Sequence, residues 1–179
     1  MSQYNPNIHH RRSIRLKGYD YSQAGLYFIT LCCYDRKCLF GEVVATDGAP
    51  TKMVLNNYGQ IAYDEWIKTT EVRDNVELGE FIIMPNHMHG IVKLSGRGEV
   101  DAPISKIAEF KSPQQTIGAI VRGYKSAVTK QLNLLNIGCV VWQRDYYEII
   151  IKDELAYQNI SNYIINNPAK WAVDKSYIL

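Results

Sequence analysis

Two histidines separated by one residue are the sharpest chemical feature of this sequence. His87 and His89 lie in the segment Pro85-Asn86-His87-Met88-His89-Gly90. In a β-strand, alternate side chains point to the same face, so both imidazoles would project together, two rises of about 3.3 Å apart. Imidazole is a common metal ligand, and the pair therefore predicts a metal site. The competing interpretation is a pair of histidines that serve only packing or hydrogen bonding.

The C-terminal part of the chain offers a nucleophile and a third metal ligand. Asn159, Tyr163 and Asn167 follow one another at intervals of four residues, and such side chains share one face of a helix. A phenol is a weak nucleophile at neutral pH because its reference pKa is about 10. A metal ion that polarises a phosphate allows such a weak nucleophile to attack it. The same pattern is typical of an exposed polar helix face, so the argument depends on the histidines.

The elements around these residues indicate an α+β fold. Runs rich in aromatic and β-branched residues predict strands at 26–34, 76–84, 87–94, 139–142 and 146–151. Apolar residues at helical spacing predict helices at 58–71 and 116–135, and Asp153 is a candidate N-cap for a last helix that Pro168 ends. The segment with Asp47-Gly48 and Pro50 is expected to be a loop. This order fits a ferredoxin-like antiparallel sheet with helices mainly on one face.

Length and composition indicate one globular domain. The chain has 179 residues, of which 46% are hydrophobic and 21% charged, enough for one closed core. We expect a basic N-terminal arm at 1–25, a single domain at 26–179 and a mobile connection at about 95–115. The four cysteines form no C-x-x-C pair, and no apolar run approaches the ~20 residues that cross a bilayer. A soluble, cytoplasmic protein without a membrane partner is expected.

Positive charge is concentrated in two stretches, although the formal net charge is only +2. The cations of interest are Arg11, Arg12, Arg15 and Lys17 near the N-terminus, and Arg122 and Lys125 on the helix predicted at 116–135. Clustered charge sets the local field, so these stretches suit a polyanion such as a nucleic acid. The competing interpretation is two ordinary solvated faces.

Three motifs together resemble a known family. They are Pro85-Asn86-His87-Met88-His89-Gly90, Trp142-Gln143-Arg144-Asp145-Tyr146-Tyr147 and Asn162-Tyr163-Ile164-Ile165-Asn166-Asn167-Pro168. In this order they resemble the HUH single-tyrosine transposases, in the branch called REP-associated tyrosine transposases. The opening Arg11-Arg12-Ser13-Ile14-Arg15-Leu16 with Gly18-Tyr19-Asp20-Tyr21 is also similar to that branch. The resemblance extends from about Arg11 to Trp171.

The resemblance implies a metal-dependent transposase or endonuclease that cleaves and rejoins single-stranded DNA beside a hairpin. His87 and His89 would hold Mg²⁺ or Mn²⁺, Asn167 would take the position of the amide ligand, and Tyr163 would form a 5′-phosphotyrosine. Two imidazoles taken alone would instead favour Zn²⁺. The N-terminal arm would help to recognise the DNA. A nucleoid-associated location would follow, and the oligomeric state stays open between a monomer and a homodimer.

Two other classes of function remain open. One is a hairpin-DNA-binding protein derived from a transposase that kept the fold and lost cleavage. The other is a different His-x-His enzyme. A histidine-triad hydrolase is disfavoured because Ile91 stands where a third alternating histidine would lie, and the predicted helices argue against an all-β cupin.

The sequence contains other candidates for the nucleophile and for base stacking. Its 13 tyrosines include Tyr124, which apolar periodicity places in the core. Of Tyr146 and Tyr147, one must face the core and the other can approach the site, because strand side chains alternate. Trp66 and Trp142 are large enough to stack on bases, but burial is the favoured interpretation for both.

Overall fold

The computed structural model describes residues 24–46, 49–95 and 116–173. Most of the expected N-terminal arm, and the expected connection at 95–115 apart from Ser95, lie outside these residues. Within the described ranges, no helix combines the length and the apolar character needed to span a bilayer.

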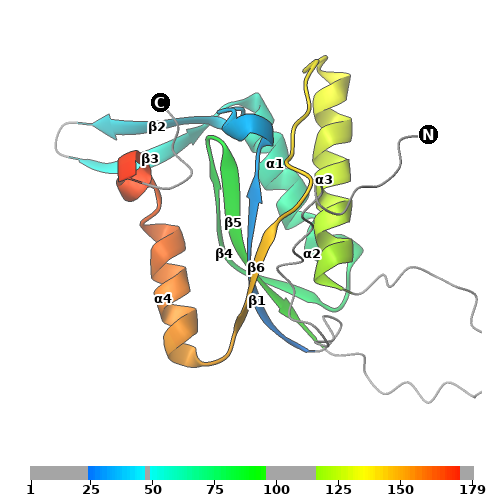
Figure 1. Ribbon diagram of the computed structural model, residues 1–179, viewed down its shortest axis with the longest axis vertical. Coiled ribbons are helices and arrows are strands. Elements are labelled where there is room, and N and C mark those ends of the chain that lie inside the picture. The colour runs from blue at the N-terminus through cyan, green and yellow to red at the C-terminus, as the bar shows by residue number, and fades with distance from the viewer. Residues whose placement is uncertain (1–23, 47–48, 96–115, 174–179) are drawn as a thin grey trace, which may run out of the picture.

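A four-stranded antiparallel sheet forms the centre of the molecule (Figure 1). Its strands are β1 (Gly25–Cys32), β4 (Val76–Met84), β5 (His87–Leu94) and β6 (Tyr147–Ile151), in the order β4-β5-β1-β6. Each neighbouring pair is antiparallel. The α+β class and the antiparallel sheet predicted from the sequence are confirmed, and Pro85-Asn86 forms a tight connection between β4 and β5.

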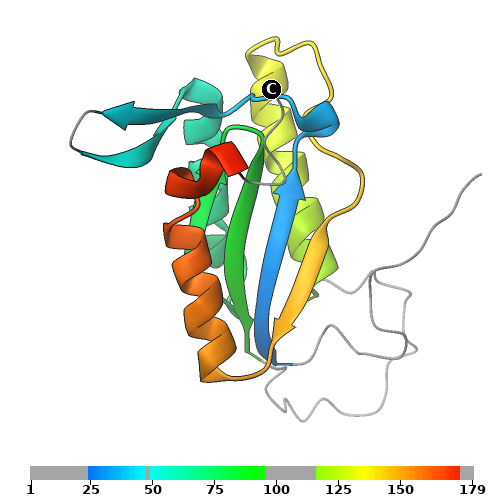
Figure 2. The same ribbon diagram turned by 60° about the vertical axis from the view of Figure 1, so that its left-hand side comes forward.

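The helices lie on both faces of this sheet. Helices α1 (Asn57–Ile67) and α3 (Ile117–Leu134) cover one face, with the short α2 (Thr69–Val72) after α1, while α4 (Glu154–Ile165) runs along the other face (Figure 2). Two 3₁₀ helices, η1 (Tyr34–Arg36) and η2 (Pro168–Val173), complete the order. The helices are thus mainly on one face as predicted, and α4 alone among the long helices faces the other side.

Side-chain caps set where the long helices begin. The side chain of Asn56 accepts a hydrogen bond from Gly59 N, that of Thr116 from Ala119 N, and that of Asp153 from Ala156 N. Each bond satisfies an amide that the first helical turn leaves without an internal partner. The predicted N-cap at Asp153 is therefore confirmed.

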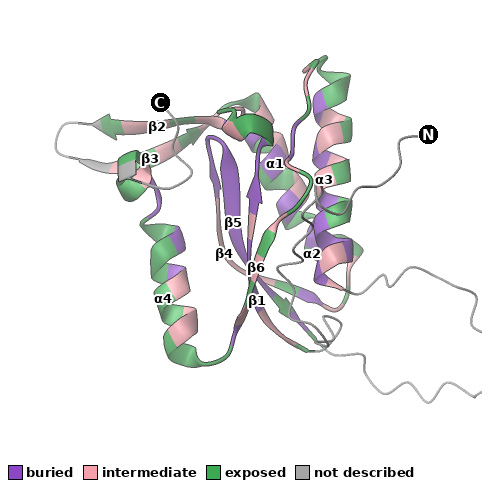
Figure 3. Cartoon of the chain, in the orientation of Figure 1, coloured by how far each residue is buried: buried purple, intermediate pink, exposed green. Residues whose placement is uncertain are grey.

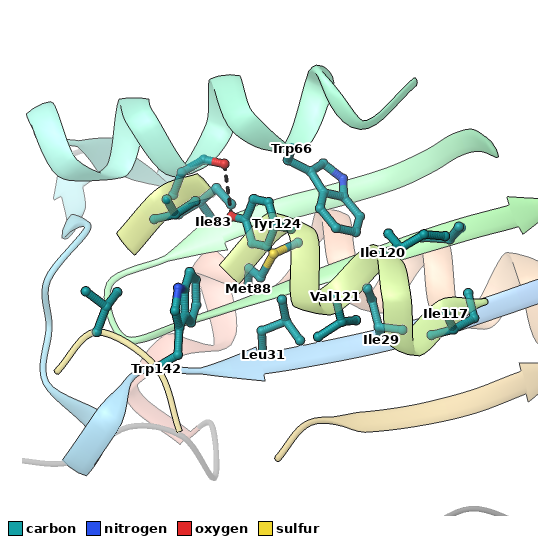
Figure 4. Packing of buried hydrophobic residues seen from close by; sticks show 14 of the residues in the cluster. Ile29, Leu31, Trp66, Ile83, Met88, Ile117, Ile120, Val121, Tyr124 and Trp142 are labelled. Atoms are coloured by element: carbon teal, nitrogen blue, oxygen red, sulfur yellow. Dashed lines mark hydrogen bonds between the residues drawn. The ribbon is translucent and has the colours of Figure 1, made fainter. Parts of the chain in front are cut away.

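The main hydrophobic core lies between the sheet and helices α1 and α3 (Figures 3 and 4). Trp66 and Trp142 are buried there, as predicted. Tyr124 is also in this core, and its hydroxyl donates to Ala62 O at 2.9 Å. Gly90 makes room for the Trp66 ring, because a Cβ at this position would lie 2.8 Å from Trp66 Cζ2. Side chains therefore fill the space between the sheet and helices α1 and α3, and a catalytic site must lie elsewhere.

The structure differs from the sequence prediction in two elements. The expected loop before the first helix contains a hairpin of β2 (Gly41–Thr46) and β3 (Ala49–Leu55), which forms its own two-stranded sheet beside the main body (Figure 1). Asp47-Gly48 between two β-branched runs was the signal for a tight turn. The strand expected at 139–142 is reduced to one isolated bridge, between Cys33 and Trp142.

Candidate active site

The two histidines lie side by side at the beginning of β5. His87 pairs with Cys32 and His89 with Thr30 across the β1–β5 ladder, so both side chains lie on the face that α4 covers. Their ring centroids are 4.5 Å apart. The exposed fraction is 0% for His87 and 4% for His89. Strand alternation thus places the imidazoles on one face, as the spacing predicts, and the surrounding structure removes them from bulk water.

Neighbouring side chains orient both imidazole rings. Nδ1 of His87 lies 2.8 Å from Oδ1 of Asn86, which can only accept, so Nδ1 is the donor. Nδ1 of His89 lies 2.8 Å from the hydroxyl of Thr30. When Nδ1 carries the proton, Nε2 of a neutral ring holds the lone pair. Outer partners of this kind fix the tautomer and direction of metal-binding histidines.

Helix α4 is anchored to the sheet by a partly buried polar contact and by an apolar cluster. The carboxylate of Glu80 on β4 accepts hydrogen bonds from Tyr157 at 2.8 Å and from Ser161 at 3.0 Å. The bond from Tyr157 is the main reason that the pKa of Glu80 is lowered. Phe28 on β1 and Ile164 on α4 also belong to a small hydrophobic cluster between the sheet and α4. These contacts fix the position of α4 over β4 and β5.

This anchoring brings Tyr163 to the histidines. Its hydroxyl lies 3.1 Å from Nε2 of His89, and the two ring centroids are 5.1 Å apart. Phe28 supports both rings, with its centroid 5.3 Å from His89 and 6.2 Å from Tyr163. Tyr163 remains 38% exposed, so a substrate can reach the phenol.

Asn167 lies two residues past the end of α4, in the turn that leads to η2. Helix α4 ends at Ile165, and the amide of Asn167 donates to Ile164 O at 3.2 Å as the chain turns. The regular helix thus stops before Asn167, because helical geometry is disfavoured for the residue before a proline. The role of Asn167 as a metal ligand stays a prediction. Asn167 is nevertheless fully buried. It precedes η2, from which Trp171 stacks on His87 at a centroid distance of 5.9 Å.

The donor set fits a loosely held divalent cation better than a closed structural metal. Among the described residues, no group of three or more His, Cys, Asp or Glu side chains could hold an ion. His87 and His89 would therefore be joined by an amide oxygen, as from Asn167, and by oxygen atoms of water or substrate. Structural zinc sites are closed by four protein ligands, whereas open positions suit an ion that acts on a phosphate.

The two predicted cations on α3 lie away from the histidines, because α3 covers the opposite face of the sheet. Arg122 is exposed. The ammonium of Lys125 donates to the carbonyl oxygens of Gln143 at 2.8 Å and Asp145 at 2.9 Å. Burial lowers the pKa of this group to about 8, and the charge of Asp145 acts in the opposite direction. Lys125 therefore holds a backbone segment, while Arg11, Arg12, Arg15 and Lys17 lie outside the described residues.

Comparison with known proteins places this chain in a family. No family model matches the chain. A protein of Haemophilus influenzae, described as uncharacterized, is 42% identical over 182 residues, which cover 99% of this chain and 98% of that protein. The chain belongs to the family of that protein.

A solved structure shows which fold this family has. It is described as a REP-associated tyrosine transposase bound to a REP hairpin. The aligned region covers 95% of this chain and 74% of the other chain, with a TM-score of 0.57 and 20% sequence identity. The chain has the fold of that transposase. The resemblance in the three sequence motifs is thus confirmed at the level of the fold.

Within this transposase fold, sequence reasoning missed the residues that support the site. Thr30 is a polar residue in an otherwise apolar strand, and Glu80 directly precedes the apolar run at 81–84, which was an available signal that each bonds to something on the α4 face. The side chain of Asn86, in the turn before β5, orients His87, and sequence reasoning gave it no role. Trp171 carried no signal, because its contact with His87 depends on how the chain leaves α4.

Proposed function

We propose that this protein cleaves and rejoins single-stranded DNA beside a hairpin, with Tyr163 as the nucleophile and His87 and His89 as ligands of a divalent cation. The observation that carries the proposal is the 3.1 Å approach of the Tyr163 hydroxyl to Nε2 of His89. A fold shared with a transposase whose solved structure contains a REP hairpin supports DNA as the partner.

The chemistry of Tyr163 is a transfer of one phosphodiester. Its oxygen forms a bond to the scissile phosphorus as the bond from phosphorus to the 3′ oxygen breaks. The phenol loses its proton and the departing 3′ oxygen gains one, which leaves a 5′-phosphotyrosine and a free 3′-hydroxyl. Because the new ester conserves the energy of the old one, a second 3′-hydroxyl can displace Tyr163 and join a strand without a nucleotide cofactor.

The histidines and their partners prepare this step. His87, His89 and Asn167 would hold Mg²⁺ or Mn²⁺, which when bound supplies a Lewis acid for the non-bridging phosphate oxygens. Nε2 of His89 has one lone pair, so it cannot accept a hydrogen bond from the phenol and bind a cation at once. A cation held by Nε2 would therefore replace this hydrogen bond and would leave the hydroxyl of Tyr163 available to a phosphate. Asn86 and Thr30 keep both rings oriented in either state.

One chain is sufficient to bring the tyrosine and the histidines together, because every contact described above is within a single chain. The proposal therefore does not require a second subunit to supply Tyr163. A homodimer and a nucleoid-associated location stay predictions, to be measured by light scattering and by imaging a fluorescent fusion.

The test is formation of a covalent adduct. The protein is incubated with a pool of end-labelled single-stranded DNAs that fold into hairpins with unpaired flanks, in the presence of Mn²⁺, and separated under denaturing conditions. We expect a protein–DNA adduct that Tyr163→Phe abolishes. Tyr63→Phe, which changes a similarly exposed tyrosine of α1 on the other face of the sheet, is the matched control and retains the adduct. Hairpin binding without any adduct would identify a DNA-binding protein that has lost cleavage, and an adduct with Tyr163→Phe would reject this nucleophile.

A further inference from the structure

A stacked indole covers one of the two imidazoles of the candidate site. Trp171 in η2 lies against His87 with an interplanar angle of 29° and ring centroids 5.9 Å apart. Trp171 is half-buried, and His87 has no exposed surface. The lone pair of a ring nitrogen lies in the plane of the imidazole, so a stacked neighbour does not compete for it. The contact is therefore compatible with the proposed role of His87 as a metal ligand.

The two imidazoles are held in the same manner. Each has a polar partner 2.8 Å from Nδ1, as described above. Each also has an aromatic neighbour, because Phe28 lies 5.3 Å from His89 at an interplanar angle of 30°, close to the angle between Trp171 and His87. A hydrogen bond at Nδ1 fixes the direction of that nitrogen but lets the ring turn about the bond. An aromatic neighbour restricts this turn, so each imidazole is fixed in two ways.

Core packing alone does not explain why an indole lies on His87. Trp66 and Trp142 are buried in the main core. Trp171 belongs to neither of the two hydrophobic clusters that the described residues form. Phe28, by contrast, is part of the cluster between the sheet and α4. The stack of Trp171 is therefore a local feature of the candidate site.

A short turn after α4 places Trp171. Asn167 is fully buried, and its carbonyl oxygen accepts a hydrogen bond from the amide of Lys170 at 3.0 Å. Helix η2 also packs against β3 (Figure 1). Asn167, the predicted amide ligand, and Trp171 are thus carried by the same turn. The tilt of the His87 ring and the position of Asn167 therefore depend on one piece of backbone.

The chemistry of the indole gives this stack a second effect. The face of an indole carries negative charge density and attracts a cation within about 6 Å of its centroid more strongly than the ring of Tyr or Phe does. An imidazole that shares its lone pair with a cation becomes more positive. Stacking on Trp171 is therefore more favourable for that state of His87 than for the metal-free state. An aliphatic side chain of similar size would cover His87 without this effect.

We propose that Trp171 is a positioning residue for His87, whose imidazole it holds at a fixed tilt and favours in the state that binds a divalent cation. The proposal rests on the proposed function, because the cation belongs to that function. It assigns Trp171 no contact with DNA or with the cation itself. The consequence is that metal affinity depends on the aromatic face of residue 171 and not only on its bulk.

The test compares Trp171→Phe with Trp171→Leu in the full chain. Both variants shorten the side chain by a similar amount, so a general loss of packing affects them equally, but only phenylalanine keeps an aromatic face. Mn²⁺ affinity is measured by electron paramagnetic resonance of the free ion. We expect Trp171→Leu to bind Mn²⁺ about 5–30-fold more weakly, and Trp171→Phe to stay within about threefold of the unsubstituted chain.

The matched control removes an aromatic contact elsewhere. Tyr63 on α1 lies 5.1 Å from Phe81, on the face of the sheet opposite α4. Tyr63→Leu loses this contact as Trp171→Leu loses the stack on His87. It should leave Mn²⁺ affinity unchanged.

A second measurement detects the stack without a metal. The ring current of an indole displaces the resonances of protons that lie over its face, so nuclear magnetic resonance of the histidine ring protons reports the contact directly. The resonances of His87 are identified by their loss in His87→Ala. We expect them to be displaced in the unsubstituted chain, displaced less in Trp171→Phe, and to lie at ordinary positions in Trp171→Leu.

Each outcome decides one question. Equal Mn²⁺ affinity of Trp171→Leu and the unsubstituted chain would overturn the proposal, as would equal losses in Trp171→Leu and Trp171→Phe, because bulk alone would then explain the effect. His87 resonances that are the same with and without Trp171 would show that the stack does not form in solution. These results leave the proposed function standing. If the unsubstituted chain binds no Mn²⁺, the proposed function itself fails, and this inference fails with it.

Discussion

The hydroxyl of Tyr163 lies 3.1 Å from Nε2 of His89, although 74 positions separate the two residues in the sequence. The contact depends on two elements that meet on one face of the sheet. Strand alternation directs His89 toward that face, and the Glu80 contact with Tyr157 and Ser161 fixes the helix that carries Tyr163. The candidate site is therefore a consequence of how α4 docks on the sheet.

Metal affinity should depend on the residue that orients His87 as well as on His87 itself. We expect His87→Ala to abolish binding of Mn²⁺ at the site, measured by electron paramagnetic resonance of the free ion. Asn86→Ala leaves both imidazoles in place but removes the acceptor for Nδ1 of His87, and should weaken binding about 10–100-fold. Mn²⁺ affinity in His87→Ala equal to that of the unsubstituted chain would place the ion elsewhere.

The anchor of α4 should be measurable as stability. Glu80→Ala removes the acceptor of two hydrogen bonds and should lower the free energy of unfolding by about 1–2 kcal/mol at pH 7. Since the folded chain lowers the pKa of Glu80 below its ordinary value of 4.5, this contribution exists above that value and disappears as the pH falls through the folded pKa. Urea unfolding at pH 7 and pH 3 measures both effects.

Glu77 on the same strand provides the control for Glu80. Its carboxylate pairs with Lys93 at 3.0 Å, but the side chain is 62% exposed. Exposed ion pairs contribute little, so Glu77→Ala should cost less than about 1 kcal/mol. An equal loss in the two variants would mean that the Glu80 contact does not anchor α4.

The glycine that follows His89 should not tolerate a side chain. In Gly90→Ala, the new Cβ would lie 2.8 Å from Trp66 Cζ2 and 3.3 Å from Phe81 Cβ, so the core must shift, at a cost of about 1–3 kcal/mol. Gly25→Ala on β1 is the control, since its Cβ would approach the Tyr27 ring no closer than 3.4 Å. Thermal unfolding compares them, and equal stability of the two variants would refute the proposed role of Gly90.

Lys125 should make stability rise with pH in an alkaline window. Burial lowers the pKa of its ammonium from 10.5 to about 8 in the folded chain. Between these values the unfolded chain holds a proton that the folded chain has lost, so the free energy of unfolding increases with pH. Lys125→Met removes this increase, and urea unfolding at pH 7.5 and pH 9.5 reveals the difference. Identical pH dependence in the two proteins would show that the amine titrates like one in water.

Local patterns predicted the elements of this site better than their arrangement. The alternation at His87 and His89 and the cap at Asp153 depend on residues close in sequence, and the structure confirms both. The side of the sheet on which α4 lies depends on contacts of Glu80 and Phe28 with residues much farther along the chain, which no local pattern encodes. Asn167 lies past the end of α4, so helical spacing alone does not give its position relative to Tyr163.

The basic residues show a second limit of sequence reasoning. Lys125 has the charge expected of a DNA contact, but its ammonium is used by backbone carbonyls. The segment at 143–145 that supplies these carbonyls has no sequence pattern that predicts its position beside α3.

The identity of the residue that becomes linked to DNA is the most direct test of the account. The protein is incubated with the hairpin DNAs of the adduct assay and Mn²⁺, digested with protease and nuclease, and analysed by tandem mass spectrometry for a tyrosine that carries a 5′-nucleotide. The account predicts that the nucleotide is on Tyr163. A nucleotide on another tyrosine, such as Tyr147 or Tyr157, or cleaved DNA without any linked tyrosine, would contradict it.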